Sequence, residues 1–268
     1  MAESNRAALR RSIPLPALAC FGGAAPNACM TWSIVAYDKA AGAFGAAVAT
    51  KAFASGSFVP FVRAGVGAVG TQSLTNRYLA PVVLDGLARG LSPKLAIEAA
   101  VAGDEGRELR QVHAVDTQGR IAAWTGRHCV EWCGSVGEPF VSVAGNMLSN
   151  DRVAAATLEG FRADPSLALP ERMLAALEAG EAAGGDRRGR QSAAMALITT
   201  EDFPDLSIHV DDHPEPLPEL RRLLGVWRRE RAPYLHNSPS KANPTGLIDL
   251  DTLDASFAAR GIPVRFKR

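Results

Sequence analysis

Met30-Thr31-Trp32-Ser33-Ile34-Val35-Ala36-Tyr37-Asp38 is an apolar run that begins well inside the 268-residue chain, and it decides the expected fold. Residues 43–51 repeat the apolar pattern after Lys39-Ala40-Ala41-Gly42, a short connection that ends in glycine. Such a pattern predicts two antiparallel strands, 31–38 and 43–51, joined by a tight turn. Both strands are apolar at nearly every position, which predicts a sheet that is covered on both faces.

The rest of the chain continues in a layered α+β order. A third strand is expected over 59–72, and a helical stretch over 77–102 is divided where Ser92 can cap and Pro93 can start a new helix. Further strands are expected at 110–116, 120–125, 140–145, 192–199 and 205–211, and further helices at 150–162, 169–183 and 216–229. This order suits a four-layer αββα sandwich, in which two stacked antiparallel sheets carry helices on their outer faces.

Three segments follow from this pattern. Residues 1–30 form an N-terminal extension with three competing explanations: a start placed too far upstream, a removed propeptide, or a weak export signal. Residues 31–229 form the folded domain. Residues 230–268 form a C-terminal tail, partly helical or flexible, with a short helix expected over 249–260.

Composition narrows the class of partner. Apolar residues make up 47% of the chain, which is enough for a sizeable core, and the net charge of +1 gives no sign of a nucleic-acid or membrane partner. No apolar run approaches the roughly 20 residues of a membrane span. We expect a cytoplasmic homo-oligomer that acts on a small-molecule substrate.

The cysteines do not form a recognisable metal set. His128, Cys129 and Cys133 supply half of a site, and the second pair of ligands is missing. The simpler interpretation is that Cys129 and Cys133 are free thiols in a reducing compartment. No metal and no cofactor is therefore expected.

Thr31 is the leading candidate nucleophile. If the chain up to Met30 is removed, Thr31 carries a free α-amine with a pKa near ~8 beside its own hydroxyl. That amine can take the hydroxyl proton, so no histidine is needed. Ser33 lies two residues on and shares the strand face, so it could orient a water or the amine. The alternative is that Thr31 is an ordinary first residue of a strand.

Amide side chains could hold the substrate or a developing oxyanion. Thr71, Gln72 and Asn76 follow the glycine-rich third strand, and Asn146 follows Ala144-Gly145. Fixed N–H donors of this kind are what an oxyanion hole requires. The alternative is that these residues cap the helices that follow.

Two charged motifs lie at strand ends. Gly184-Gly185-Asp186-Arg187-Arg188-Gly189-Arg190-Gln191-Ser192 could bind a carboxylate or phosphate through Arg187, Arg188 and Arg190, with Asp186 holding one of them in place. The alternative is a solvated turn. Asp211-Asp212-His213 is most simply a strand exit that leads into the next helix.

Several of these motifs together resemble the bacterial DUF1028 family. The resemblance runs from about 30 to about 229 through the first strand, Gly45-Ala46-Ala47-Val48-Ala49-Thr50-Lys51, residues 63–72, residues 184–192 and residues 210–214. It favours a start at Met30. The family is placed by fold in the N-terminal-nucleophile (Ntn) hydrolase superfamily, which implies the αββα sandwich.

The same resemblance suggests a role for Lys51. Threonine-type Ntn enzymes hold a lysine on a neighbouring strand close to the nucleophile, and an ammonium there favours loss of a proton from the amine and hydroxyl. The alternative is a strand-end lysine that reaches solvent. The function expected is an N-terminal-nucleophile amidohydrolase acting on a small amide or lactam-like, anionic substrate. The alternative is a non-catalytic ligand-binding or scaffold protein.

Overall fold

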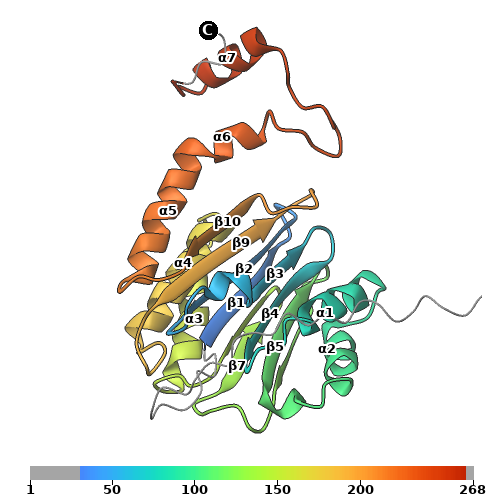
Figure 1. Ribbon diagram of the computed structural model, residues 1–268, viewed down its shortest axis with the longest axis vertical. Helices are drawn as coiled ribbons and strands as arrows, with labels where there is room; N and C mark the ends of the chain where they lie inside the picture. Colours follow the sequence, from blue (N-terminus) through green and yellow to red (C-terminus); the bar gives the residue numbers. More distant parts are fainter. Residues whose placement is uncertain (1–30, 264–268) are drawn as a thin grey trace, which may run out of the picture.

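The structure is a computed structural model that describes residues 31–263, and its strands form two antiparallel sheets that face each other (Figure 1). One sheet has six strands in the order β10-β9-β2-β1-β8-β7, and the other has four in the order β3-β4-β5-β6. The strands span Thr31–Asp38 (β1), Ala43–Thr50 (β2), Pro60–Arg63 (β3), Gly67–Ser73 (β4), Arg110–Asp116 (β5), Ile121–Thr125 (β6), Gly134–Glu138 (β7), Val141–Gly145 (β8), Ser192–Ile198 (β9) and Leu206–Val210 (β10).

The expected β1–β2 hairpin is confirmed, and it lies at the centre of the six-stranded sheet. Its register pairs Asp38 with Ala43 at the turn and Thr31 with Thr50 at the open end. Asp38 Oδ1 accepts hydrogen bonds from the backbone N–H groups of Ala40 and Ala41, which organises the turn. β2 ends at Thr50, one residue earlier than predicted.

The single strand predicted over 59–72 is wrong, because the structure has two strands there. β3 and β4 form a tight hairpin in which Arg63 pairs with Gly67. Gly65 turns the chain with φ of +66°, a conformation that a residue with a side chain rarely adopts. The apolar run through the turn hid this break in the sequence pattern.

The helices lie close to the predicted positions. The longer ones span Leu79–Ala88 (α1), Pro93–Ala102 (α2), Arg152–Arg162 (α3), Leu169–Ala182 (α4), Pro216–Glu230 (α5) and Leu250–Ala258 (α7). The predicted division near 92 is confirmed: Ser92 accepts a hydrogen bond from the N–H of Leu95, and Pro93 begins α2. The prediction missed β7 and the short helix Ala232–Leu235 (α6).

Successive side chains of β1 face two different layers, the helices on one side and the second sheet on the other. Trp32, Ile34 and Ala36 belong to a buried cluster with residues of α3 and α4, whereas Val35 packs in a cluster with Ala68 of β4. The helices α1 and α2 pack on the outer face of the four-stranded sheet. Successive side chains of a strand point to opposite faces, so Thr31 and Ser33 share the face of Val35, toward the other sheet.

The two sheets approach closely at Gly70 of β4. A Cβ atom built there would lie 3.0 Å from Ser33 Oγ and closer still to the ring of His113. A glycine within a strand permits such a close approach. It lets polar side chains of the two sheets reach each other in the interior.

The C-terminal segment leaves the sheets after α5, which packs against β10. Figure 1 shows α7 set apart beyond α6, where the rings of Tyr234 and Phe257 lie 4.7 Å apart. The Lys241 ammonium ties the segment back to the β9–β10 turn, 2.7 Å from Asp202 Oδ1. The short helix expected over 249–260 is thus present as α7.

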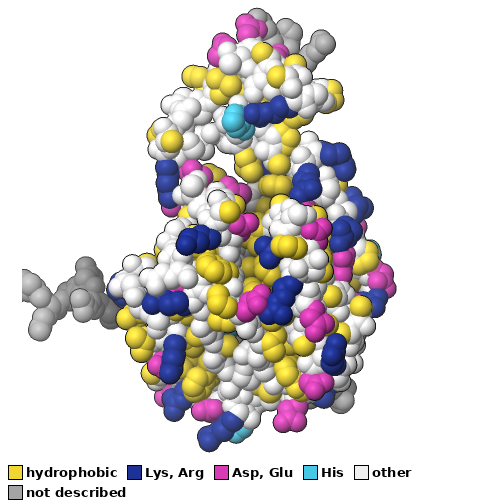
Figure 2. Space-filling view, turned by 180° about the vertical axis from the view of Figure 1, so that it is seen from behind, with side chains coloured by type: hydrophobic (Ala, Val, Ile, Leu, Met, Phe, Trp, Pro, Cys, Tyr) yellow, Lys and Arg dark blue, Asp and Glu magenta, His cyan; other side chains and the backbone are white. Residues whose placement is uncertain are grey.

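Two surface properties complete the fold. On the face seen in Figure 2, acidic and basic side chains are interspersed, and neither sign forms a continuous field. Among the described residues, no helix combines the length and the apolar character that crossing a lipid bilayer requires. Residues 1–30, and therefore the predicted extension, lie outside the described residues.

Candidate active site

Thr31 begins the central strand and is fully buried between two neighbouring strands. Its N–H donates to the carbonyl of Asn146 at 3.3 Å, and the Asn146 N–H donates back to the Thr31 carbonyl at 3.0 Å. These bonds continue the β1–β8 ladder by one pair. Thr50 is its partner on the other side, in β2. Cross-strand neighbours have Cβ atoms about 5 Å apart, so Thr50 and Asn146 flank Thr31 on its own face.

A chain of hydroxyls leads from Thr31 to a buried carboxylate. Thr31 Oγ1 lies 3.2 Å from Thr50 Oγ1, which lies 3.3 Å from Asp186 Oδ2. The Asp186 side chain is 0% exposed and also accepts the backbone N–H of Lys51 at 2.9 Å. The turn that brings Asp186 here passes through Gly184 and Gly185, both at positive φ. The glycine-rich motif therefore places the Asp186 carboxylate beside Thr50, the strand partner of Thr31.

On the other side of Thr31, three side-chain amides form a buried network between the sheets. Gln72 Nε2 donates to the carbonyls of Thr31 at 3.3 Å and Ala144 at 3.0 Å, and to Gln111 Oε1 at 2.8 Å. Asn146 Nδ2 donates to Gln111 Oε1 at 2.9 Å and to the Thr31 carbonyl at 3.4 Å. The network holds the main chain of Thr31 from the opposite sheet.

The surrounding bonds determine how the Asn146 amide is oriented. Gln111 Nε2 faces the Thr125 hydroxyl at 3.0 Å and the Gly145 carbonyl at 2.8 Å, which fixes Gln111 Oε1 as the atom that meets Asn146. Asn146 must therefore present its Nδ2. Its Oδ1 is buried and has no hydrogen-bond partner among the described residues. Asn146 thus has an open acceptor, while the donor needed for the expected oxyanion role is already engaged.

Ser33 lies deeper in the same interior. Its hydroxyl donates to Gln72 Oε1 at 2.7 Å and lies 2.8 Å from His113 Nε2. The other nitrogen of that ring, Nδ1, lies 3.0 Å from Ser142 Oγ. Because the Ser33 hydrogen goes to Gln72, His113 Nε2 is the donor to Ser33. Burial lowers the pKa of His113 to about 3, so the ring is neutral at pH 7. Ser33 and His113 lock the two sheets together beneath Thr31.

Lys51 does not place its ammonium on Thr31. The ammonium donates to the carbonyl of Arg190 at 3.2 Å, and Lys51 is exposed. Within the described residues, no hydrogen bond joins it to the Thr31 hydroxyl. The side chain that faces Thr31 across the hairpin is that of Thr50, and Lys51 contributes through its backbone N–H to Asp186.

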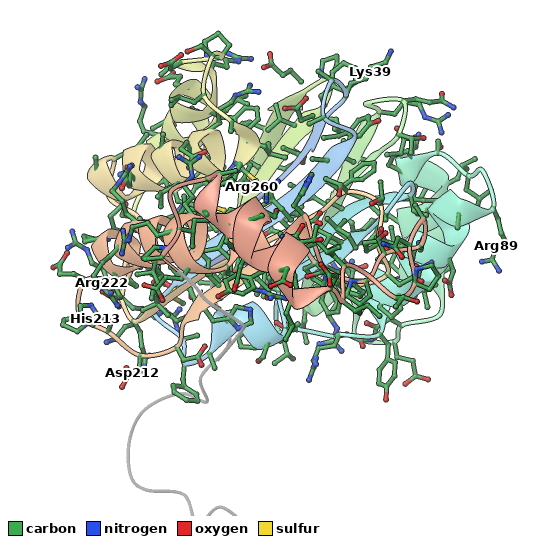
Figure 3. The ribbon with its side chains drawn as sticks, turned by 90° about the horizontal axis from the view of Figure 1, so that it is seen from above. Lys39, Arg89, Asp212, His213, Arg222 and Arg260 are labelled. Carbon is green, nitrogen blue, oxygen red and sulfur yellow. The ribbon has the colours of Figure 1, made fainter. Side chains whose placement is uncertain are left out.

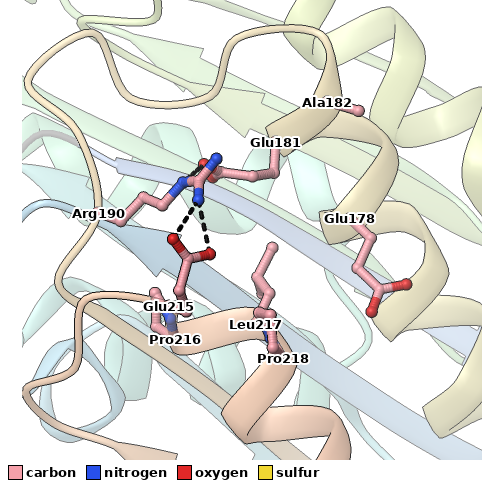
Figure 4. A pocket seen from close by; sticks show the side chains of 8 residues that line it. All are labelled: Glu178, Glu181, Ala182, Arg190, Glu215, Pro216, Leu217 and Pro218. Carbon is pink, nitrogen blue, oxygen red and sulfur yellow. Dashed lines mark hydrogen bonds and ion pairs between the residues drawn. The ribbon is translucent and has the colours of Figure 1, made fainter.

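Two of the three arginines in the motif are bound to carboxylates. Arg188 forms a bidentate pair with Asp186, at 3.0 Å and 2.6 Å. Arg190 lies between Glu181 and Glu215 (Figure 4), and its Nη1 is 2.6 Å from Glu215 Oε2. It lines a cavity of about 260 Å³ whose other walls are mainly acidic and apolar: Glu178, Glu181, Ala182, Glu215, Pro216, Leu217 and Pro218. This cavity is ill-suited to an anion.

Arg187 is held differently. Its Nη1 donates to the backbone carbonyl of Glu131 at 3.1 Å, and its N–H donates to the carbonyl of Met147 at 3.2 Å. Arg187 is exposed, and no ion pair to it occurs within residues 31–263. It is the arginine of the motif whose charge is still available.

The other predicted polar residues lie outside this cluster. Thr71 Oγ1 bonds to the carbonyl of Asn76 at 3.3 Å, and Asn76 itself binds Asp104 at 2.9 Å and accepts the N–H of Tyr78. These bonds organise the entry to α1, which is the alternative that the sequence left open. In the second charged motif, His213 Nδ1 accepts the N–H of Glu215 at the start of α5.

The two described cysteines are free thiols in the loop beside Met147. Cys129 is buried, and its Sγ donates to the carbonyl of Arg110 at 3.3 Å. Burial raises the pKa of both Cys129 and Cys133. A raised thiol pKa keeps both sulfurs protonated and poorly nucleophilic.

Sequence reasoning missed Thr50 and Gln111. The hairpin turn already implied that Thr31 pairs with Thr50, so the register carried the signal for the first. Gln111 and His113 share one face of β5, whose other interior positions are apolar, and buried polar residues in such a pattern must find partners. The carboxylate of Asp186 at Thr50 had no comparable signal, because 136 residues separate them.

Comparison with known proteins supports one family. Residues 31–220 match the family described as "Family of unknown function (DUF1028)". The crystal structure of a DUF1028 protein from Silicibacter pomeroyi superposes with a TM-score of 0.76 and 31% sequence identity, over 82% of this chain and 96% of that one. The comparison with curated proteins gave no match.

A second solved structure is much less similar. Anbu (ancestral beta-subunit) from Yersinia bercovieri aligns over 73% of this chain and 94% of that chain, with a TM-score of 0.36 and 10% identity. A similarity at that level carries no argument about this chain.

Proposed function

This chain belongs to the DUF1028 family, and we propose that it is an N-terminal-nucleophile amidohydrolase of Ntn-hydrolase type that cleaves a small amide or lactam-like bond. The observation that carries the proposal is the position of Thr31. Its hydroxyl meets the Thr50–Asp186 chain, and its main chain is held by Asn146 and Gln72. A first residue of a strand with only a structural role does not need both a hydroxyl chain to a carboxylate and side-chain amides on its main chain.

The open acceptor of Asn146 gives the proposal its second support. In the uncut chain, the single N–H of Thr31 goes to the Asn146 carbonyl. A free neutral amine has two hydrogens, so one can stay on that carbonyl while the second is a donor available to Asn146 Oδ1, which is otherwise unsatisfied within the described residues. The amine lone pair is then free to accept the proton of the Thr31 hydroxyl. Asn146 becomes an acceptor that orients the base.

The reaction then follows two steps. The amine takes the Oγ1 proton as Oγ1 attacks the substrate carbonyl; the C–N bond breaks, the proton passes to the leaving nitrogen, and an ester to Thr31 remains. Water, deprotonated by the same amine, hydrolyses the ester and restores the hydroxyl. In the resting site Thr50 donates its hydrogen to Asp186 and accepts that of Oγ1, which positions the nucleophile before its proton turns to the amine.

A rival function is a ligand-binding or scaffold protein without catalysis. One observation favours it: Thr31 is 0% exposed, and the hydroxyls and amides around it, apart from Asn146 Oδ1, are already paired. The two functions differ in the chemical state of Thr31, because a backbone amide cannot act as the base.

Intact-mass measurement on protein expressed from the whole reading frame separates the two. Catalysis predicts a mature chain that begins at Thr31 and releases amine or ammonia from members of an amide and lactam library. A chain that retains residues 1–30 and turns over nothing would establish the rival function instead.

A further inference from the structure

The charge of Arg187 distinguishes it from the other cations of its turn. The buried carboxylate of Asp186 neutralises Arg188, and Glu181 and Glu215 surround Arg190. Arg187 makes only hydrogen bonds to backbone carbonyls within residues 31–263 and is exposed. Its remaining guanidinium donors are therefore available to a ligand.

Arg187 is also connected to Thr31 by two short routes. It follows Asp186, which reaches Thr50, the partner of Thr31 in the hairpin. Its own N–H bonds to Met147, which follows Asn146, the partner of Thr31 in the ladder. An isolated bridge between Leu148 and Asp186 fixes these two segments to each other. Arg187 is therefore anchored to both sides of the nucleophile.

The charges around it do not cancel this cation. Glu131 accepts a hydrogen bond from Arg187 through its backbone carbonyl, and among the described residues no ion pair joins the two side chains. Lys51, on the other side of Asp186, is a second exposed cation, and among the described residues its ammonium is held only through a carbonyl. A guanidinium offers parallel N–H groups that match a carboxylate, and such charge-assisted pairs are strong.

We propose that Arg187 binds the anionic group of the substrate and thereby places a neighbouring amide carbonyl at Thr31. The substrate class is a small amide that carries a carboxylate, and Arg187 is its specificity-determining residue. This inference rests on the proposed amidohydrolase function, but binding of the anion requires neither the free amine nor turnover.

The test compares two probes that differ in charge alone. Isothermal titration calorimetry on the full chain measures the binding of succinamate, which carries one carboxylate and one amide, and of succinamide, its neutral counterpart. Arg187→Gln keeps a donor for the Glu131 carbonyl and removes the charge, whereas Arg187→Lys keeps the charge. Arg89→Gln makes the same charge change at the end of α1, at the opposite edge of the molecule from His213 (Figure 3).

We expect the parent to bind succinamate at least tenfold more tightly than succinamide, because hydrogen bonds to charged groups account for such factors. Arg187→Gln should abolish that preference, Arg187→Lys should retain part of it, and Arg89→Gln should leave it unchanged. A melting curve for each variant confirms that it is folded.

Three results would overturn the inference: a parent without preference for the anion, an Arg187→Gln variant that keeps the preference, or an equal loss in Arg89→Gln. The hydrolase proposal fails separately. If succinamate binds through Arg187 while no amide is cleaved and Thr31 stays within the chain, the anion site stands and the catalytic function does not.

Discussion

Thr31 Oγ1 and Thr50 Oγ1 lie 3.2 Å apart on adjacent central strands, because the hairpin register makes these residues direct partners. The contact gains its chemical meaning from Asp186, which reaches Thr50 from a turn 136 residues later. A hydroxyl at the start of a strand is thus connected to a buried carboxylate by a single intermediate. The following predictions test what each member of this group does.

Thr31→Ala should abolish amidase activity in the mature enzyme while the fold remains. Losing one hydroxyl removes a hydrogen bond that is typically worth ~1 kcal/mol in unfolding free energy. Losing the nucleophile should lower kcat by on the order of 10³-fold or more. Thr31→Ser keeps the hydroxyl and the amine and should retain part of the activity. Turnover by Thr31→Ala at the rate of the parent would exclude this nucleophile.

Thr50→Val replaces the hydroxyl by a methyl of similar size and interrupts the chain between Thr31 and Asp186. We expect kcat to fall about 10²-fold, the size of effect that misplacing a reacting group produces, with little change in KM. Thr50→Ser restores the hydroxyl and should recover most of the loss. If Thr50→Val had the kcat and KM of the parent, the 3.2 Å contact between the Thr31 and Thr50 hydroxyls would contribute to packing and not to catalysis.

Asp186→Asn should destabilise the protein by about 2–3 kcal/mol, because it weakens hydrogen bonds to a charged group and leaves Arg188 without its counter-charge. Asp85→Asn is the matched control. It breaks the exposed Arg63–Asp85 pair, at 2.8 Å, which should cost less than about 1 kcal/mol. Urea unfolding measures both. Equal effects at the two positions would contradict a special role for the buried carboxylate.

His113 should make the fold sensitive to mild acid. Its pKa is lowered to about 3 by burial, whereas in the unfolded chain it is near the ordinary value of 6.5. Between these values the unfolded state binds the extra proton, so stability is fully present above pH 6.5 and falls as the pH drops toward 3. The slope for this one group is about 1.4 kcal/mol per pH unit.

A matched variant isolates that contribution. His113→Gln keeps a donor and an acceptor for Ser33 and Ser142 but cannot titrate, so its urea-unfolding free energy should change less between pH 6.5 and 4.5. Asp104 acts in a lower pH window. Its hydrogen bond to Arg110 lowers its pKa to about 2, so the stability that it contributes is lost as the pH falls below its ordinary pKa of 3.8. Identical pH slopes for the parent and His113→Gln would refute the assignment.

Much of the fold was predictable from local pattern. The β1–β2 hairpin, the division at Ser92 and the later helices follow from turn residues, capping and apolar periodicity, all of which act over a few neighbours. The prediction failed where the local signal was weak. The break at Gly65 lies within a continuous glycine-rich apolar run, and β7 contains two glycines and lies at a sheet edge.

The sequence by itself determined the family, the strand that begins at Thr31, and the hydroxyl nucleophile proposed there, because these depend on adjacent residues and motif order. Only the tertiary structure decided which side chains surround that hydroxyl. Beside Thr50, which the hairpin register already implied, it placed Asp186 instead of the Lys51 ammonium, and it engaged the donor of Asn146. The contacts of Asp186 and Asn146 depend on sheet stacking and on the burial that forces polar groups to pair, and no local pattern encodes them.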